Sequence, residues 1–273
     1  GGRFFIYDAY PYSFKEYLAA QHVELKEHWE YDTIQRSEVK RHLNEYFYYG
    51  GLPEILSFKN KRAMLSSLYQ KIYLGDICAR NNIKNDRVLN ILIKKMAESV
   101  KQPLSYNRLK NVIVATGSPI SVPTTIDYVD YASDSWLILP LENEVGKLTE
   151  KEMQKKYYFV DNGLLNLFLM NSETSLLENM VAVELCRRFG KKNVFCLNTD
   201  KEIDFIVPDE KLAIQVSYNI KDDITYNREV PPLAKYAKAH ENWKCLLITY
   251  DEEGTEEGIP VVPVWKWLMR NGL

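Results

Sequence analysis

The sequence predicts a multidomain α+β protein, with helices in its N-terminal part and a mixed sheet in its C-terminal part. Apolar residues recur at helical spacing up to about residue 82. Between residues 83 and 165, short helices precede two strands. From residue 166 onward the order becomes helix, strand, strand, strand, helix, strand. The last strand, helix, strand step is a crossover, and a crossover joins parallel strands of one sheet.

Residues 1–20 are the first of four segments into which the sequence divides. They begin with the strand-like run Phe4–Tyr7, which ends before Pro11. A helix is expected directly after Ser13, because Glu16 stands three residues later and the two residues form a capping box.

Residues 21–82 are expected to be helical. The run Gly50-Gly51-Leu52-Pro53 divides this range, since glycine ends a helix and proline is accepted at the start of the next one. Another helix is expected from about Arg62 to Ala79.

Residues 83–165 are expected to form a winged helix, because three short helices precede a two-stranded ribbon. The helices are marked by Val88 to Met96, by the cap Ser105 and by Pro123, and the strands are Trp136–Leu139 and Tyr157–Val160.

Residues 166–273 are expected to form an α/β domain. Its predicted elements are a helix at Leu176–Phe189, strands at Val194–Leu197, Glu202–Val207 and Leu212–Tyr218, a helix at Thr225–Ala239 and a strand at Cys245–Thr249.

Two polar residues are expected to face each other in the hairpin of this domain. A four-residue turn after Val207 sets Asp204 opposite Gln215, with side chains about 5 Å apart. Either Glu178 or Glu184, on the preceding helix, would complete a set of oxygen ligands for one hard cation. The alternative is that the same face is only the solvated side of an edge hairpin.

A basic stretch precedes this domain. From Lys84 to Val114 there are seven basic and two acidic residues, a net charge of +5. The residues that we assign to phosphate contact are Lys94, Lys95, Lys101, Arg108 and Lys110. The third helix carries Asp127 and Asp130 and no cation, which disfavours base readout in a major groove. We therefore expect a protein-contact or interdomain role first and non-specific DNA contact second.

Composition argues against a strongly basic nucleic-acid-binding protein, a zinc or disulfide framework and a transmembrane protein. The net charge is −2, the four cysteines lack metal-ligand spacing, and no apolar run reaches the ~20 residues of a bilayer span. With no signal peptide at the N-terminus, a cytoplasmic location without membrane contact is expected.

The order of a helix glutamate, Asp204 and Gln215-x-Ser217 resembles the restriction-endonuclease-like superfamily. The resemblance implies carboxylates that bind magnesium or manganese, and a lysine that activates water. Ser217 stands where that lysine is expected, so the resemblance implies a degenerate site unless another cation replaces it. Candidates for that replacement are Lys201, Lys221 and Arg228.

A wider set of landmarks looks like a prokaryotic family of predicted AAA-like ATPases whose C-terminal domain of unknown function has a nuclease-like core. The landmarks are Gly2-Arg3, Pro11 to Leu18, Gly50 to Glu54, Tyr73 to Ile77, Lys156 to Leu164, Glu178-Asn179, Glu202 to Phe205 and Ile214 to Ser217.

The family resemblance assigns residues 1–20 to the tail of a P-loop ATPase core, with Arg3 near nucleotide or in a structural role, and residues 21–82 to a helical lid. It also implies an upstream P-loop domain as partner. The chain itself has no G-x-x-x-x-G-K-[ST] motif, so ATP is expected only in the full-length parent.

Three functional hypotheses follow. The first is the C-terminal part of such an ATPase, with a nuclease-like domain used in binding or regulation through partner proteins or self-association. The second is an active metal-dependent nuclease coupled to the ATPase. The third is a DNA-binding or toxin-control module.

Overall fold

The structure is a computed structural model that describes residues 7–198 and 202–270. Apart from Tyr7, the strand expected at Phe4–Tyr7 lies outside the described residues, as do Arg3 and Lys201.

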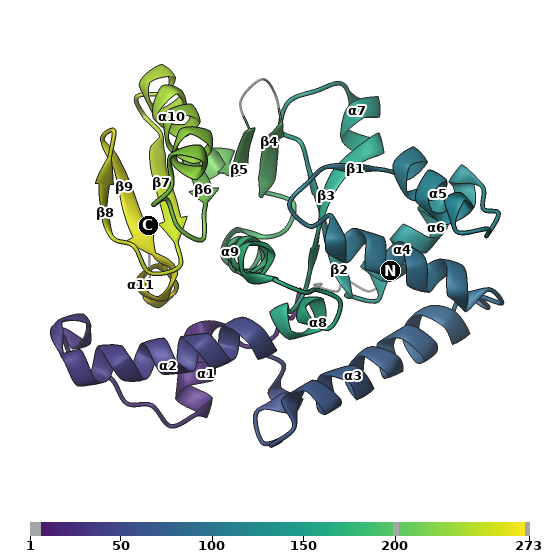
Figure 1. Ribbon diagram of the computed structural model, residues 1–273, viewed down its shortest axis with the longest axis horizontal. Coiled ribbons are helices and arrows are strands. Elements are labelled where there is room, and N and C mark those ends of the chain that lie inside the picture. Colours follow the sequence, from purple (N-terminus) through teal and green to yellow (C-terminus); the bar gives the residue numbers. More distant parts are fainter. Residues whose placement is uncertain (1–6, 199–201, 271–273) are drawn as a thin grey trace, which may run out of the picture.

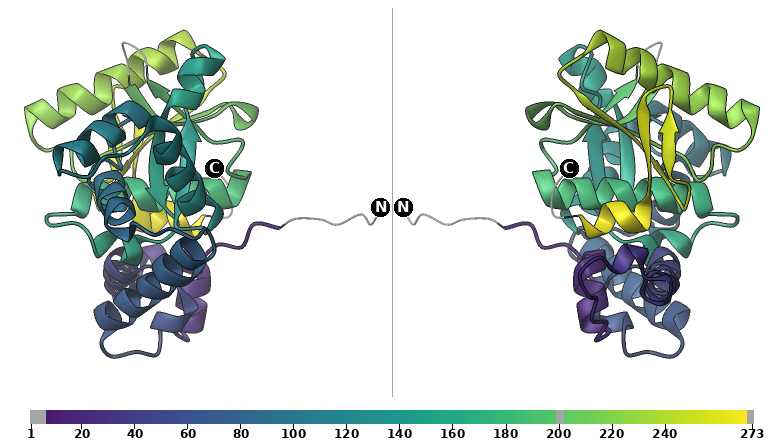
Figure 2. Two further views of the ribbon diagram at one scale, coloured as in Figure 1. Left: turned by 90° about the vertical axis from the view of Figure 1, so that its right-hand side faces the viewer. Right: turned by 90° about the vertical axis from the view of Figure 1, so that its left-hand side faces the viewer.

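The fold is mixed α/β, with two sheets and a layer of N-terminal helices (Figure 1). One long helix, α9 (Glu173–Phe189), lies between the two sheets and contacts strands of both. The N-terminal helices form a separate layer next to the ends of the sheets, as the side views in Figure 2 show.

The N-terminal layer begins with α1, whose predicted capping box is confirmed. The Glu16 backbone donates to Ser13 Oγ, and the Ser13 backbone donates to the Glu16 carboxylate. Helix α2 ends at Gly50, where φ is +76°. The elements of this layer are α1 (Phe14–Ala20), η1 (Trp29–Tyr31), α2 (Thr33–Tyr49), η2 (Pro53–Ile55), α3 (Lys61–Lys71) and the π-helical η3 (Ile72–Ala79).

The middle part of the chain contains a three-stranded antiparallel sheet in the order β1-β3-β2. The predicted helix starts at Ser105 and near Pro123 are confirmed, whereas the strand expected from Trp136 begins at Ile138. The elements are α4 (Asp86–Glu98), β1 (Leu104–Ser105), α5 (Tyr106–Ala115), α6 (Val122–Asp134), β2 (Ile138–Glu142), α7 (Leu148–Met153) and β3 (Gln154–Phe159).

The C-terminal part contains a six-stranded mixed sheet in the order β4-β5-β6-β7-β9-β8. The predicted crossover is confirmed, because β6 and β7 are parallel and α10 connects them. The elements that follow β3, in addition to α9, are α8 (Asn162–Asn166), β4 (Phe195–Asn198), β5 (Glu202–Val207), η4 (Pro208–Glu210), β6 (Leu212–Val216), α10 (Asp223–Ala239), β7 (Lys244–Thr249), β8 (Gly254–Glu256), β9 (Ile259–Pro263) and α11 (Val264–Met269).

The β5–β6 hairpin lies inside this sheet, between β4 and β7. Phe205 and Ile214 are buried in the main core, which also contains residues of α9, while Ile206 and Ala213 pack with residues of α10. Apolar side chains therefore cover both faces of the hairpin along most of its length.

Hydrogen bonds connect the end of α2 to the segment after β3, at a place where glycines lie close to Asp161. The Gly51 and Gly163 backbones each donate to the carboxylate of Asp161, at 2.8 Å. The Asn162 and Asn166 side chains donate to the carbonyl oxygens of Phe47 and Tyr48 at the end of α2. These bonds satisfy carbonyls that a helix end leaves unpaired, and they hold the N-terminal layer against α8.

Within residues 7–198 and 202–270, no helix combines the length and the apolar character that a bilayer crossing requires.

Candidate functional site

The hairpin register places Asp204 beside Gln215, as predicted. The pairs Phe205–Ile214 and Ile206–Ala213 fix this register, and the Asp204 backbone donates to Gln215 Oε1 at 3.3 Å. Both side chains are buried, with 6% and 5% exposure. The alternative of a solvated edge hairpin is therefore wrong, because β4 and β7 cover the two edges.

Of the two helix glutamates, Glu178 faces Asp204 and Glu184 does not. Glu184 lies six residues further along α9, where Arg187 and Arg188 pair with its carboxylate at 3.1 and 2.7 Å. Two residues six apart on a helix point to different faces, so only one of them can reach the hairpin.

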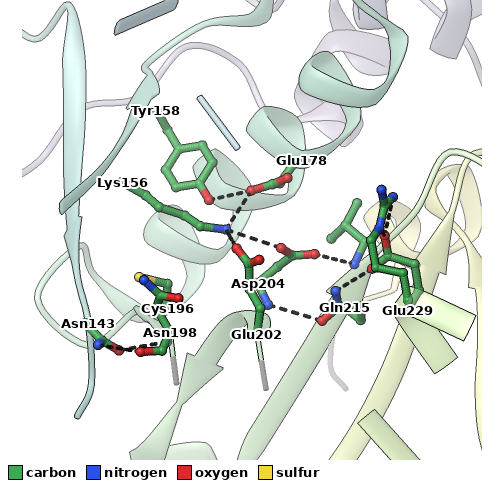
Figure 3. Close-up of polar contacts among 12 residues, drawn as sticks. Asn143, Lys156, Tyr158, Glu178, Cys196, Asn198, Glu202, Asp204, Gln215 and Glu229 are labelled. Carbon is green, nitrogen blue, oxygen red and sulfur yellow. Dashed lines mark hydrogen bonds and ion pairs between the residues drawn. The ribbon is translucent and has the colours of Figure 1, made fainter. Parts of the chain in front are cut away.

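A buried lysine joins Glu178 to Asp204. Lys156, on β3, places its Nζ 3.2 Å from Glu178 Oε1 and 3.3 Å from Asp204 Oδ1 (Figure 3). Glu202 Oε1 lies 3.3 Å from the same ammonium. The Lys156 side chain has no exposed surface, so its charge is balanced inside the protein.

The charged groups around this ammonium shift one another's pKa values. Burial alone lowers the pKa of Lys156, but Glu178, Asp204 and Glu202 together raise it well above its ordinary value, so the lysine stays charged. Burial raises the pKa of Glu178 to about 7, and the charge of Asp204 adds to this effect while Lys156 opposes it. Glu178 therefore titrates near neutrality, beside a permanent cation.

Further hydrogen bonds fix the carboxylates. Tyr158, two residues after Lys156 on β3, donates its hydroxyl to Glu178 Oε1 at 2.8 Å. The Val216 backbone donates to Asp204 Oδ2 at 2.9 Å. Next to Glu178 on α9, Asn179 exchanges two hydrogen bonds with the Phe159 backbone. Helix α9 and strand β3 are thus locked together at the cluster.

The amide of Gln215 is directed toward helix α10. Its Nε2 donates to the carboxylate of Glu229 at 2.5 Å, and Arg228 pairs with the same carboxylate at 2.6 Å. Burial raises the pKa of Glu229, and the nearby Asp204 raises it further. Gln215 thereby links Asp204 to a second, more exposed ion pair.

Ser217 and the two candidate cations within the described residues, Lys221 and Arg228, have partners outside the cluster around Lys156. The Ser217 hydroxyl donates to Asn219 O at 2.7 Å. Lys221 is exposed and lies 4.0 Å from Glu252, while Arg228 pairs with Glu229. The cation of the cluster is Lys156, which comes from an earlier strand.

The arrangement does not fit the magnesium or manganese ion that the superfamily resemblance implies. Glu178, Glu202 and Asp204 all turn an oxygen toward the Lys156 ammonium, which takes the space between them. Asp204 Oδ2 and Gln215 Oε1 each accept a backbone hydrogen bond. In the described part of the chain, no group of three or more histidine, cysteine, aspartate or glutamate side chains is arranged to hold a metal ion.

A cavity of about 430 Å³ opens beside the cluster. Glu178, Glu202 and Asp204 line it, together with Gln215 and Ser217. The cations Lys101 and Arg228 also line it, as does the carboxylate of Glu229. Lys156 is not among the lining residues and lies behind the carboxylates.

Comparison with known proteins finds similarity over part of the chain and to uncharacterized relatives. Residues 40–175 match a family described as a domain of unknown function, DUF8612. An uncharacterized protein of Methanocaldococcus jannaschii is 30% identical over 276 residues, which cover 94% of this chain and 62% of that protein. An uncharacterized protein of Haemophilus influenzae is 30% identical over 279 residues, covering 98% of this chain and 66% of that protein.

The chain thus spans about two thirds of the length of these prokaryotic relatives. No solved structure is significantly similar to it.

The five candidate phosphate-binding cations lie in different surroundings. Lys101 lies at the carboxylate cavity, where its Nζ donates to Thr174 Oγ1 at 3.0 Å. Arg108 lines a neighbouring cavity that shares Gln102 and Glu202 with the first. Lys95 pairs with Glu98, and Lys94 and Lys110 line neither of these two cavities.

No pattern in the sequence predicts that Lys156, Tyr158 and Glu229 belong to the cluster. Lys156 and Tyr158 belong to a strand otherwise rich in buried aromatic residues, and a lysine in such a run is itself a signal. Glu229 lies within the predicted helix Thr225–Ala239 among apolar residues, where a carboxylate needs a partner.

Proposed function

We propose that this chain is the C-terminal portion of an AAA-like ATPase whose nuclease-like domain acts in binding or regulation and does not cleave nucleic acid. One observation carries the proposal: the Lys156 ammonium lies within 3.3 Å of Glu178, Glu202 and Asp204. A resident ammonium neutralises the carboxylates that a divalent cation would otherwise need to neutralise. It lies behind the cavity lining, where it cannot contact a phosphate.

The order of elements supports the domain assignment within this proposal. Helix α4, strand β1, helices α5 and α6 and strands β2 and β3 follow the order of a winged helix, with a three-stranded antiparallel sheet. Its α6 exposes Asp127 and Asp130, which favours contact with protein over contact with DNA. The α9-β4-β5-β6-α10-β7 order with parallel β6 and β7 supports the restriction-endonuclease-like assignment.

The test is a metal-binding and cleavage experiment on the full-length parent protein and its Lys156→Met variant. Mn²⁺ is titrated while thermal unfolding is followed. The wild type should keep its midpoint, whereas Lys156→Met should be stabilised, because an uncompensated carboxylate cluster gains a cation that binds only the folded state. Lys155→Met, in which the lost lysine pairs with the more exposed Glu142 and Glu152, is the matched control and should not respond.

The same proteins are incubated with labelled DNA and RNA in Mg²⁺ or Mn²⁺. No cleavage is expected from the wild type. Cleavage by the wild type that is lost in Asp204→Ala would overturn the proposal in favour of an active metal-dependent nuclease. Stabilisation of the wild type by Mn²⁺ that Asp204→Ala abolishes would overturn the claim that the Lys156 ammonium takes the place of a metal ion.

The ATPase part of the proposal has a separate test. The resemblance places a P-loop in the portion of the parent upstream of this chain, so the full-length protein should bind ATP. A parent sequence without a G-x-x-x-x-G-K-[ST] motif would refute it.

A further inference from the structure

A second cavity, of about 330 Å³, lies on the C-terminal sheet and shares no lining residue with the carboxylate cavity. Strands β7 and β9 and helix α11 contribute to its walls, together with the last turn of α10 and the β8–β9 turn. In Figure 1 these elements are the yellow and yellow-green end of the chain. A cavity of this size accommodates a small organic molecule.

The walls of this cavity are mainly apolar and aromatic. Its apolar lining is formed mostly by Trp243, Cys245, Leu246, Ile259, Pro260 and Trp267. Trp267 is 1% exposed, and the Arg188 guanidinium lies over its ring at 4.6 Å. Such a fixed indole forms a rigid wall.

Trp243 is held in place by other aromatic rings. Tyr236 packs edge-on against it, with ring centroids 5.5 Å apart, and His240 lies at 5.9 Å. Tyr236 and His240 stack on each other at 4.0 Å. Because this half-buried indole is already fixed, a planar ligand that stacks on it has little side-chain ordering to overcome.

The charged residues that line the cavity are both cations. Lys244 and Arg270 line it and are exposed, and within residues 7–198 and 202–270 neither has an ion-pair partner. Burial raises the pKa of the Cys245 thiol to about 11, so this thiol carries no negative charge at neutral pH. The described lining therefore offers positive charge without compensation.

We infer that this cavity binds a small planar apolar anion, with aromatic carboxylates as the chemical class. The half-buried ring of Trp243 and the aliphatic wall take the planar apolar part of the ligand. Lys244 and Arg270 pair with its carboxylate, and a guanidinium binds a carboxylate through two parallel hydrogen bonds. A cation of similar shape would meet two like charges.

The experiment is calorimetric titration of the full 273-residue chain with three probes of one shape. They are naphthalene-2-carboxylate, its neutral carboxamide and naphthalen-2-ylmethylamine. The carboxylate should bind with a Kd of about 1 mM or tighter. It should bind about tenfold more tightly than the carboxamide, and the amine should not bind.

Two variants separate the charge from the apolar walls. The Lys244→Gln/Arg270→Gln double variant should bind carboxylate and carboxamide within about twofold of each other. Ala237→Phe, which fills the cavity from α10, should lose binding of both. The matched control is Lys84→Gln/Arg87→Gln, which removes the same charges at exposed positions outside the cavity and should change neither affinity.

Equal affinity for the carboxylate and the amine would overturn the inference, as would binding that survives Ala237→Phe. An absence of saturable carboxylate binding up to about 10 mM would overturn it as well, since that is far above the expected Kd. Folding of each variant is checked by its thermal unfolding midpoint, so that lost binding is not confused with lost structure.

Discussion

Replacing Lys156 with methionine is expected to lower the free energy of unfolding by about 3–5 kcal/mol at pH 8. Removing one partner of a buried ion pair leaves an uncompensated charge, and this is the range that such changes cost. Methionine has nearly the same length as lysine, so loss of packing contributes little. The main cost is the mutual repulsion and burial of Glu178 and Asp204, which are 4% and 6% exposed.

The cost should depend on pH. At pH 5.5 Glu178, whose pKa is already raised to about 7 in the wild type, binds a proton and removes one of the two charges. We therefore expect the destabilisation to fall by at least about 1 kcal/mol between pH 8 and pH 5.5. Urea unfolding of the 273-residue chain at both pH values, followed by far-UV circular dichroism, measures both quantities.

Lys155→Met is the control for this measurement. Lys155 is the adjacent residue and pairs with Glu142 and Glu152, whose side chains are 39% and 56% exposed, so the expected loss is below about 1 kcal/mol. If Lys156→Met costs no more than Lys155→Met, or if its cost is the same at both pH values, Lys156 is not the counter-ion of the cluster and the reasoning fails.

Three further outcomes are expected. In the wild type, Glu178 holds its proton more tightly in the folded than in the unfolded state, so the free energy of unfolding should fall by on the order of 3 kcal/mol as pH rises from about 4.5 to about 7. Glu178→Gln should remove this pH dependence from urea unfolding curves. Superimposable pH profiles of wild type and variant would contradict this. Gly50→Ala should cost at least about 2 kcal/mol in the same assay, because φ is +76° and a Cβ would lie 2.1 Å from Asp161. Gly75→Ala is the control and should be neutral or stabilising, since its Cβ meets nothing within 4 Å. Similar losses at both positions would refute the clash. Asn179→Ala should cost about 3 kcal/mol in thermal unfolding, because the Phe159 backbone N–H and C=O and the Asn162 side-chain oxygen lose three hydrogen bonds. A loss below about 1 kcal/mol would show that water replaces these bonds.

Much of the local structure could be predicted from the sequence because local signals determine it. The Ser13–Glu16 cap needs only its own four residues, and the β5–β6 register follows from the turn length and the alternation of side chains. The crossover from β6 to β7 follows equally from the order of elements. In each case the residues that interact are near one another in the chain or are linked by one short connection.

The composition of the cluster could be predicted only in part. Asp204 and Gln215 lie on the two strands of one hairpin, so the sequence predicts that they are close together. Lys156 is 48 residues from Asp204 in sequence and reaches it because β3 packs against α9. The choice between Glu178 and Glu184 likewise depends on which face of α9 meets the hairpin. Only the packing of distant elements decides these two points.

The bonds between α2 and α8 have a consequence for how the chain unfolds. The terminal carbonyls of α2 accept from Asn162 and Asn166, and Asn162 also accepts from Asn179 of α9. Melting the last turn of α2 therefore leaves side-chain amides on α8 without hydrogen-bond acceptors. Disordering α8 in turn leaves the terminal carbonyls of α2 without donors. Such mutual dependence makes unfolding cooperative across segments more than a hundred residues apart. A protease cut in the loop between α2 and α3 should accordingly leave two fragments that stay associated and melt together.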